Sequence, residues 1–137
     1  MKTLIQMFSI FALGVAVGSL AIPASSAPSA PVRKTTVTRL MTTDLAGWCD
    51  GKEMIIEINA STSGTSGPHY HPGHSFNYVI GGTQLVTAEG SPPRTYRAGE
   101  VFPEAPMTSS TSESPSPTRM VTVRILEKGK PETVYVQ

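Results

Sequence analysis

The stretch GPHYHPGHSFNYVIGG, residues 67–82, decides how the chain is interpreted, because it joins an expected strand and turn to all three histidines of the protein. His69, His71 and His74 lie within six residues. On a strand, His69 and His71 would project from the same face, close enough to share one ion. Imidazole binds several transition metals, so this pair indicates a metal without choosing among them.

The segments on either side of this stretch read as short strands separated by turns. Gly81 and Gly82 are typical of a tight hairpin, and the Ser/Thr/Pro-rich residues 108–118 are interpreted as a rim loop or a decayed segment of the site. Short strands with turn signals every 8 to 12 residues or so predict a β-sandwich or barrel, and no helix is expected. The expected strands are residues 34–41, 54–59, 75–80, 83–88 and 119–126, with a short strand and a bend within 94–100 and a closing segment at 133–137.

The N-terminal residues have the layout of a secretory signal peptide. A positive Lys2 precedes an uncharged apolar run, residues 4–21, and small residues follow it. We therefore expect a signal peptide over residues 1–24, a disordered linker over 25–33 and one domain over 34–137, in a secreted or periplasmic protein. A retained membrane anchor is the alternative, since the apolar run is close to spanning length.

The charge balance excludes some classes of partner. Of 11 basic and 10 acidic residues, one basic residue, Lys2, lies in the expected signal peptide, so the mature chain is neutral. Neutrality predicts no nucleic acid and no membrane as a partner after signal cleavage. The single cysteine, Cys49, cannot form an internal disulfide, so the domain depends on its packed core.

The quoted stretch resembles the first signature of the cupins, in which a glycine is followed by HxH, a Pro-Gly spacer, a Tyr-Val-Leu-like strand and a glycine turn. Residues 96–106, YRAGEVFPEAP, resemble the second signature, and residues 119–126 follow where the family has its closing strand. The resemblance covers nearly all of residues 34–137. It implies an all-β fold, the small jelly-roll barrel or double-stranded β-helix, and a homodimer formed by strand exchange or sheet packing.

Two departures from the cupin pattern concern the metal ligands. Ser75 stands where the family has its glutamate ligand, and no histidine follows the second signature. His74 has two interpretations. Alternation after the Pro-Gly turn groups it with Phe76 and Tyr78 on an inward apolar side, whereas the ligand spacing of the family turns residue 75 inward instead.

These residues support several hypotheses about function. One is an exported cupin that binds a small molecule in its barrel, with a divalent Fe, Mn, Zn, Ni or Cu ion on His69, His71 and His74. Water or Glu104 would complete that site, although Glu104 is also explained as a solvated turn carboxylate. A pocket without metal is the alternative. The residues expected to contact a ligand are Ser75, Phe76, Tyr78 and Glu104.

The resemblance also implies two other classes of function. The first is a metal-dependent enzyme, such as a dioxygenase, decarboxylase or isomerase, for which the sequence singles out no catalytic residue. The two missing ligands weigh against redox chemistry, which needs firm coordination together with open positions. The second is a degenerate cupin with a structural or partner-binding role.

Overall fold

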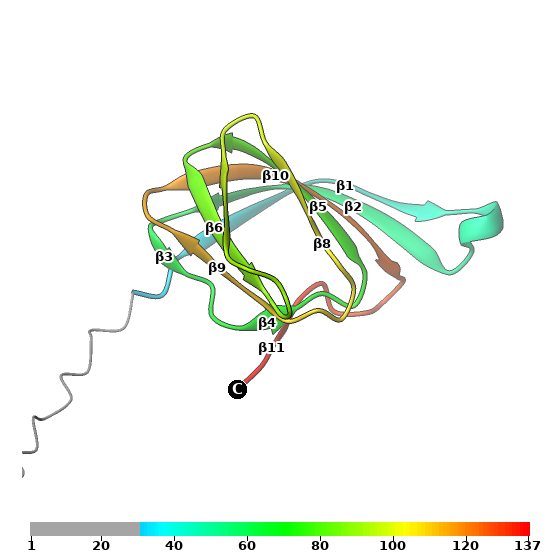
Figure 1. Cartoon of the computed structure of the whole chain (residues 1–137). Coiled ribbons are helices and arrows are strands. Elements are labelled where there is room, and N and C mark those ends of the chain that lie inside the picture. Colours follow the sequence, from blue (N-terminus) through cyan, green and yellow to red (C-terminus); the bar gives the residue numbers. More distant parts are fainter. Residues whose placement is uncertain (1–30) are drawn as a thin grey trace, which may run out of the picture.

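A computed structural model describes residues 31–137 (Figure 1). The expected signal peptide and residues 25–30 of the expected linker lie outside the described residues. No helix in the described part is long and apolar enough to cross a membrane. Apart from a 3-10 turn at Gly47–Cys49, the regular elements are the strands β1 Thr35–Leu45, β2 Lys52–Ser61, β3 Gly64–Thr65, β4 His69–Tyr70, β5 His74–Gly81, β6 Thr83–Ala88, β7 Arg94–Arg97, β8 Val101–Glu104, β9 Ser110–Ser114, β10 Thr118–Glu127 and β11 Val134–Tyr135.

The strands form two antiparallel sheets, which confirms the all-β jelly-roll prediction. One sheet has the order β1-β2-β10-β5-β8, and the other has the order β11-β4-β9-β6-β7 with β3 also paired to β9. Figure 1 shows the two sheets facing each other around the barrel interior, with the β1–β2 hairpin extending away from it. The expected hairpin is present, because β5 passes into β6 at Gly81 and Gly82.

The segment expected to be a rim loop is in part a strand. Residues 110–114 form β9, which pairs with β6, β3 and β4 in the middle of the second sheet. Ser110, Ser112 and Ser114 are buried and alternate with more exposed neighbours. Alternation with period two is the strand signal, but here the inward residues are serines. The serine-rich composition therefore suggested a loop where the structure has a strand.

Residues 31–33, which fall in the expected linker, run beside β3. Val32 forms a parallel bridge with Thr65, and the amide of Arg33 donates to the carbonyl of Thr65 at 3.0 Å. This part of the chain is therefore tied to the barrel by backbone hydrogen bonds.

The inner face of the five-stranded sheet carries many polar residues beside its apolar core, and the outer face of β5 is apolar. On β5, Ser75 and Asn77 are buried, whereas Phe76, Tyr78 and Ile80 are each more than 40% exposed. The inward apolar side predicted from alternation is therefore wrong for this strand, and the spacing of the cupin pattern gives its orientation correctly. Other strands of this sheet also bury polar residues, including Glu57 and Asn59 on β2 and Thr122 on β10.

The apolar core is correspondingly small. Val79, Val86, Phe102 and Met120 form it, and Tyr96 packs against them. The ring of Tyr96 stacks on Phe102 with centroids 4.6 Å apart. Because polar side chains line much of the remaining interior, the barrel encloses a hydrophilic cavity.

Candidate metal centre

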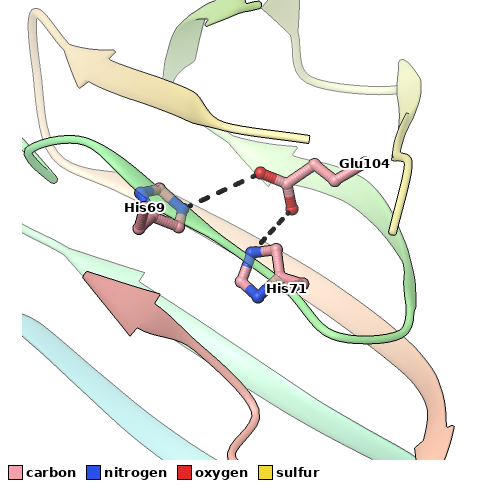
Figure 2. Close-up of side chains that lie close together, drawn as sticks. All are labelled: His69, His71 and Glu104. Atoms are coloured by element: carbon pink, nitrogen blue, oxygen red, sulfur yellow. Dashed lines mark ion pairs between the residues drawn. The ribbon is translucent and has the colours of Figure 1, made fainter. Parts of the chain in front are cut away.

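His69, His71 and Glu104 converge inside the barrel (Figure 2). One ligand atom from each lies within 4.8 Å of the others. His69 lies on β4 of one sheet, and His71 is the first residue after that strand. Glu104 ends β8 at the edge of the other sheet. The cluster therefore joins the two sheets across the barrel.

Each histidine ring is held by its Nδ1 atom. His71 Nδ1 lies 2.7 Å from the carbonyl oxygen of Glu132, and His69 Nδ1 lies 3.0 Å from that of Gly67. A carbonyl only accepts, so each Nδ1 carries the proton and donates it. In the neutral ring, Nε2 is then left with a lone pair. This arrangement is typical of histidines that bind metal ions through Nε2.

The two Nε2 atoms face the carboxylate of Glu104. His71 Nε2 is 3.3 Å from Glu104 Oε2, and His69 Nε2 is 4.0 Å from Oε1. Two lone pairs that face each other repel, so the close approach of His71 to Glu104 requires either a proton on Nε2 or a metal ion between the two atoms. One proton can bridge His71 Nε2 and Glu104, but it cannot also bond to His69 Nε2. A metal ion can be shared by all three atoms.

The surroundings of Glu104 favour its charged form. Burial acts to raise the pKa of this carboxyl, but the hydrogen bond and charge of His71, the Asn77 amide and the charge of His69 outweigh it and lower the pKa to about 2. Asn77 Nδ2 donates to Oε2 at 2.9 Å. Burial also lowers the pKa of His69, against the opposing effects of the Gly67 carbonyl and Glu104. Near neutral pH, the cluster thus offers an anionic carboxylate and a neutral imidazole at His69.

Glu104 occupies a place that links it to the cupin pattern. It is the cross-strand partner of Ser75 in the register of β5 and β8. Ser75 is fully buried and stands where the family has its glutamate. The carboxylate therefore comes from β8, which lies beside β5, the strand on which the cupin pattern has its glutamate. The cross-strand partner of His69 on β9 is Ser110, close to where the family has its last histidine.

The other predicted site residues lie elsewhere. His74 is exposed and its ring stacks on Phe76, with centroids 6.2 Å apart. Tyr78 is exposed on the same outer face. The structure therefore does not bring His74, Phe76 or Tyr78 to the cavity. Because the Pro72-Gly73 turn precedes β5, His74 begins the strand on its outward side.

The cavity beside the cluster has a volume of about 580 Å³, within the usual range for small-molecule sites. Charged residues that the sequence analysis did not single out line it. Glu57 is 1% exposed and forms an ion pair with Arg124, and Arg124 Nη1 is also 3.5 Å from Glu132 Oε2. The sequence signal for these residues was the alternation of Glu57 and Asn59 with isoleucines in residues 56–59. Besides the cluster itself, the charged or amide residues of the lining are Arg33, Glu57, Asn59, Asn77, Arg124 and Glu132.

No protein-family model matches the chain, and a search of curated proteins finds no match. Solved structures do match. The chain is similar to a cupin superfamily protein of Desulfitobacterium hafniense, with 10% identity and a TM-score of 0.57 over 72% of this chain and 84% of that one. It is also similar to a cupin-like protein of Thermotoga maritima, with 20% identity and a TM-score of 0.51 over 74% and 75%.

A third similar structure is the DMSP lyase DddQ of Ruegeria pomeroyi, with 15% identity and a TM-score of 0.55 over 61% of this chain. The match spans 43% of the lyase, less than half its length. At such identities the likeness concerns the fold, so function has to be argued from the site.

Proposed function

Because this chain has the cupin fold, we propose that it binds one divalent transition-metal ion through His69, His71 and Glu104 and holds a small molecule in the adjoining cavity. One observation carries the proposal. Three atoms that can bind a metal ion, two imidazole Nε2 and a carboxylate oxygen, converge to within 4.8 Å, while the opposite nitrogen of each ring lies against a backbone carbonyl.

The distances suit a bound ion. Nitrogen and oxygen ligands lie about 2.0–2.2 Å from zinc, so two of them in tetrahedral geometry are about 3.4 Å apart. The separations of 3.3 and 4.0 Å between the imidazoles and Glu104 are close to that value. Two histidines and one carboxylate suit Fe, Mn, Zn, Ni and Cu to differing degrees.

Three protein ligands leave coordination positions free for a small molecule. Structural zinc sites normally have four protein ligands, whereas sites that bind a substrate keep a position open. When bound, the ion would act as a Lewis acid toward an oxygen of the ligand. His69 and His71 would hold it, and Asn77 would orient the Glu104 carboxylate by its hydrogen bond.

A metal-dependent enzyme is the second candidate. A set of two histidines and one carboxylate with open positions is the donor set of non-haem iron oxygenases. Glu104 supplies the carboxylate that the sequence lacks at position 75, which removes one objection to a dioxygenase. Retained metal without turnover would favour a binding protein, and a chain that takes up neither metal nor ligand would fit a structural role.

We further propose that the protein is exported and forms a homodimer. Residues 1–24 carry the signal-peptide pattern, and the mass of protein recovered from the periplasm or medium tests their removal. The apolar outer face of the five-stranded sheet, which includes Phe76, Tyr78, Ile80 and Val101, supports a second copy as its partner, because exposed apolar patches of this kind mark interfaces.

Metal binding is tested by elemental analysis of protein purified without a histidine tag, followed by calorimetric titration with Zn²⁺ and Mn²⁺. We expect about one ion per chain. The variants His71→Ala and Glu104→Gln should lose it, because each removes a ligand. His74→Ala is the matched control: it changes the same residue type three positions along the chain, on the outer face.

The control also makes the experiment decisive. Retention of one ion by His74→Ala, together with loss in the other two variants, supports the three-residue site. Absence of metal uptake by the unmodified protein, or equal loss in His74→Ala, would contradict it.

A further inference from the structure

Arg33 is a cation in the cavity wall without a carboxylate partner. Its Nη1 donates to Ser114 Oγ at 3.3 Å, and no carboxylate of the described residues lies within ion-pair distance of it. Burial lowers the pKa of Arg33, although attraction by Glu104 opposes this. A guanidinium that is partly removed from water and has no anion beside it would be stabilised by an anionic ligand.

The chain holds Arg33 in this position by its backbone. Residues 31–33 run along β3, where the amide of Thr65 donates to the carbonyl of Pro31 at 2.9 Å and the amide of Arg33 donates back to Thr65. Gly64 permits this close approach. Its φ is +124°, and a Cβ atom there would lie 2.1 Å from the Pro31 carbonyl oxygen. The N-terminal segment is therefore a strap, residues 31–33, that brings Arg33 to the cavity.

The charges around the cavity would carry a positive excess, which an anion could balance, once a divalent ion is bound. Glu57 and Glu132 are matched by Arg39 and Arg124, with which they form ion pairs. Arg33 and Glu104 then remain, and their charges sum to zero. A divalent ion bound by the His69, His71 and Glu104 cluster would raise the local balance to +2, which favours an anionic ligand.

We propose that the small molecule bound in the cavity is an organic carboxylate, with a carboxylate group held by the guanidinium of Arg33. The planar fork of arginine matches the two oxygens of a carboxylate and binds them through two parallel hydrogen bonds. This inference rests on the proposed function, because a second group of the same molecule would occupy an open position on the metal ion. Arg33 contacts the ligand and is not a metal ligand.

The test titrates metal-loaded protein with acetate, malonate and succinate, and with the corresponding uncharged amides, by calorimetry. We expect at least one carboxylate to bind, and its amide to bind at least about tenfold more weakly. Arg33→Gln should weaken carboxylate binding at least about tenfold and leave the metal content at one ion per chain. The matched control is Arg119→Gln, which replaces an exposed arginine of β10.

Two further measurements separate the carboxylate site from the metal site. Gly64→Ala should displace the strap and weaken the carboxylate as Arg33→Gln does, again with the metal retained. Repeating the titration on metal-free protein gives the contribution of Arg33 alone. Carboxylate binding that is lost in Arg33→Gln would support the anion site even in a chain that takes up no metal.

Three results would overturn the inference. They are equal affinity of Arg33→Gln and unmodified protein for the carboxylate, equal affinity of carboxylate and amide, and loss of the metal in Arg33→Gln. Absence of binding by every carboxylate in both metal-loaded and metal-free protein would count against it as well.

Discussion

Replacing Glu104 by glutamine should remove a measurable part of the acid sensitivity of the fold. The pKa of this carboxyl is about 2 in the folded chain, against an ordinary 4.5. Because the pKa is depressed by folding, the stabilisation is fully present above pH 4.5 and is lost as the pH falls toward 2. At about 1.4 kcal/mol per pH unit, the difference corresponds to about 3 kcal/mol.

Glutamine has nearly the shape of protonated glutamic acid, so the two proteins should have similar stability at pH 2. At pH 5, unmodified protein should be more stable by about 3 kcal/mol. The assay is urea unfolding followed by circular dichroism, on chelator-treated protein, at half-unit steps from pH 2 to 7. Glu113→Gln, at an exposed position of β9, is the control for loss of a carboxylate.

A constant difference between Glu104→Gln and unmodified protein across this pH range would refute the reasoning. It would mean that the charge of Glu104 contributes nothing to folding. The geometry of His71 and Asn77 around the carboxylate would then have no energetic effect in the metal-free chain.

The other predictions concern metal binding, the turn at Gly82 and dimer formation. Adding Zn²⁺ at 100 times its Kd should stabilise unmodified protein by about 3 kcal/mol, seen as a rise in Tm that a chelator reverses and that His71→Ala lacks. Gly82→Ala should destabilise more than Gly90→Ala in urea unfolding. Both glycines have positive φ, where an alanine is strained by about 1–2 kcal/mol. Only at Gly82 would the added Cβ also meet a backbone oxygen, at 2.3 Å. That clash adds about 1–3 kcal/mol. Tyr78→Lys should turn a dimer into a monomer in sedimentation velocity, whereas Arg97→Gln should not; a monomeric unmodified protein would contradict the homodimer.

The strands that the sequence predicted are those with β-branched or apolar residues. Residues 83–88 match β6 as expected, and residues 54–59 and 119–126 lie within β2 and β10. The missed strands have other compositions. β9 is built of serine, threonine and glutamate, and β8 contains Pro103, which lies at a sheet edge where a missing amide is tolerated.

The site was only partly predictable for a physical reason. His69 and His71 could be paired from their spacing, because both lie on one short extended segment. Glu104 was named with water as a way to complete the site, but it is 33 residues beyond His71 (104 − 71), and its approach depends on strand pairing that no local pattern reveals. The orientation of His74 was misjudged by alternation because the usual relation is inverted in β5, where polar residues face a cavity and apolar residues face outward.

The pairing of Ser75 with Glu104 makes this candidate site depend on strand alignment more than on a contiguous motif. The side chains of a strand alternate between its faces, so a slip of β8 by one residue would bring Pro103 inward and turn the carboxylate out of the barrel. An insertion or deletion in the turn before β8 would therefore be expected to abolish the site without changing any of its three residues. A bound ion would also stabilise the one alignment of β8 that brings Glu104 to the histidines, relative to alignments shifted by one residue.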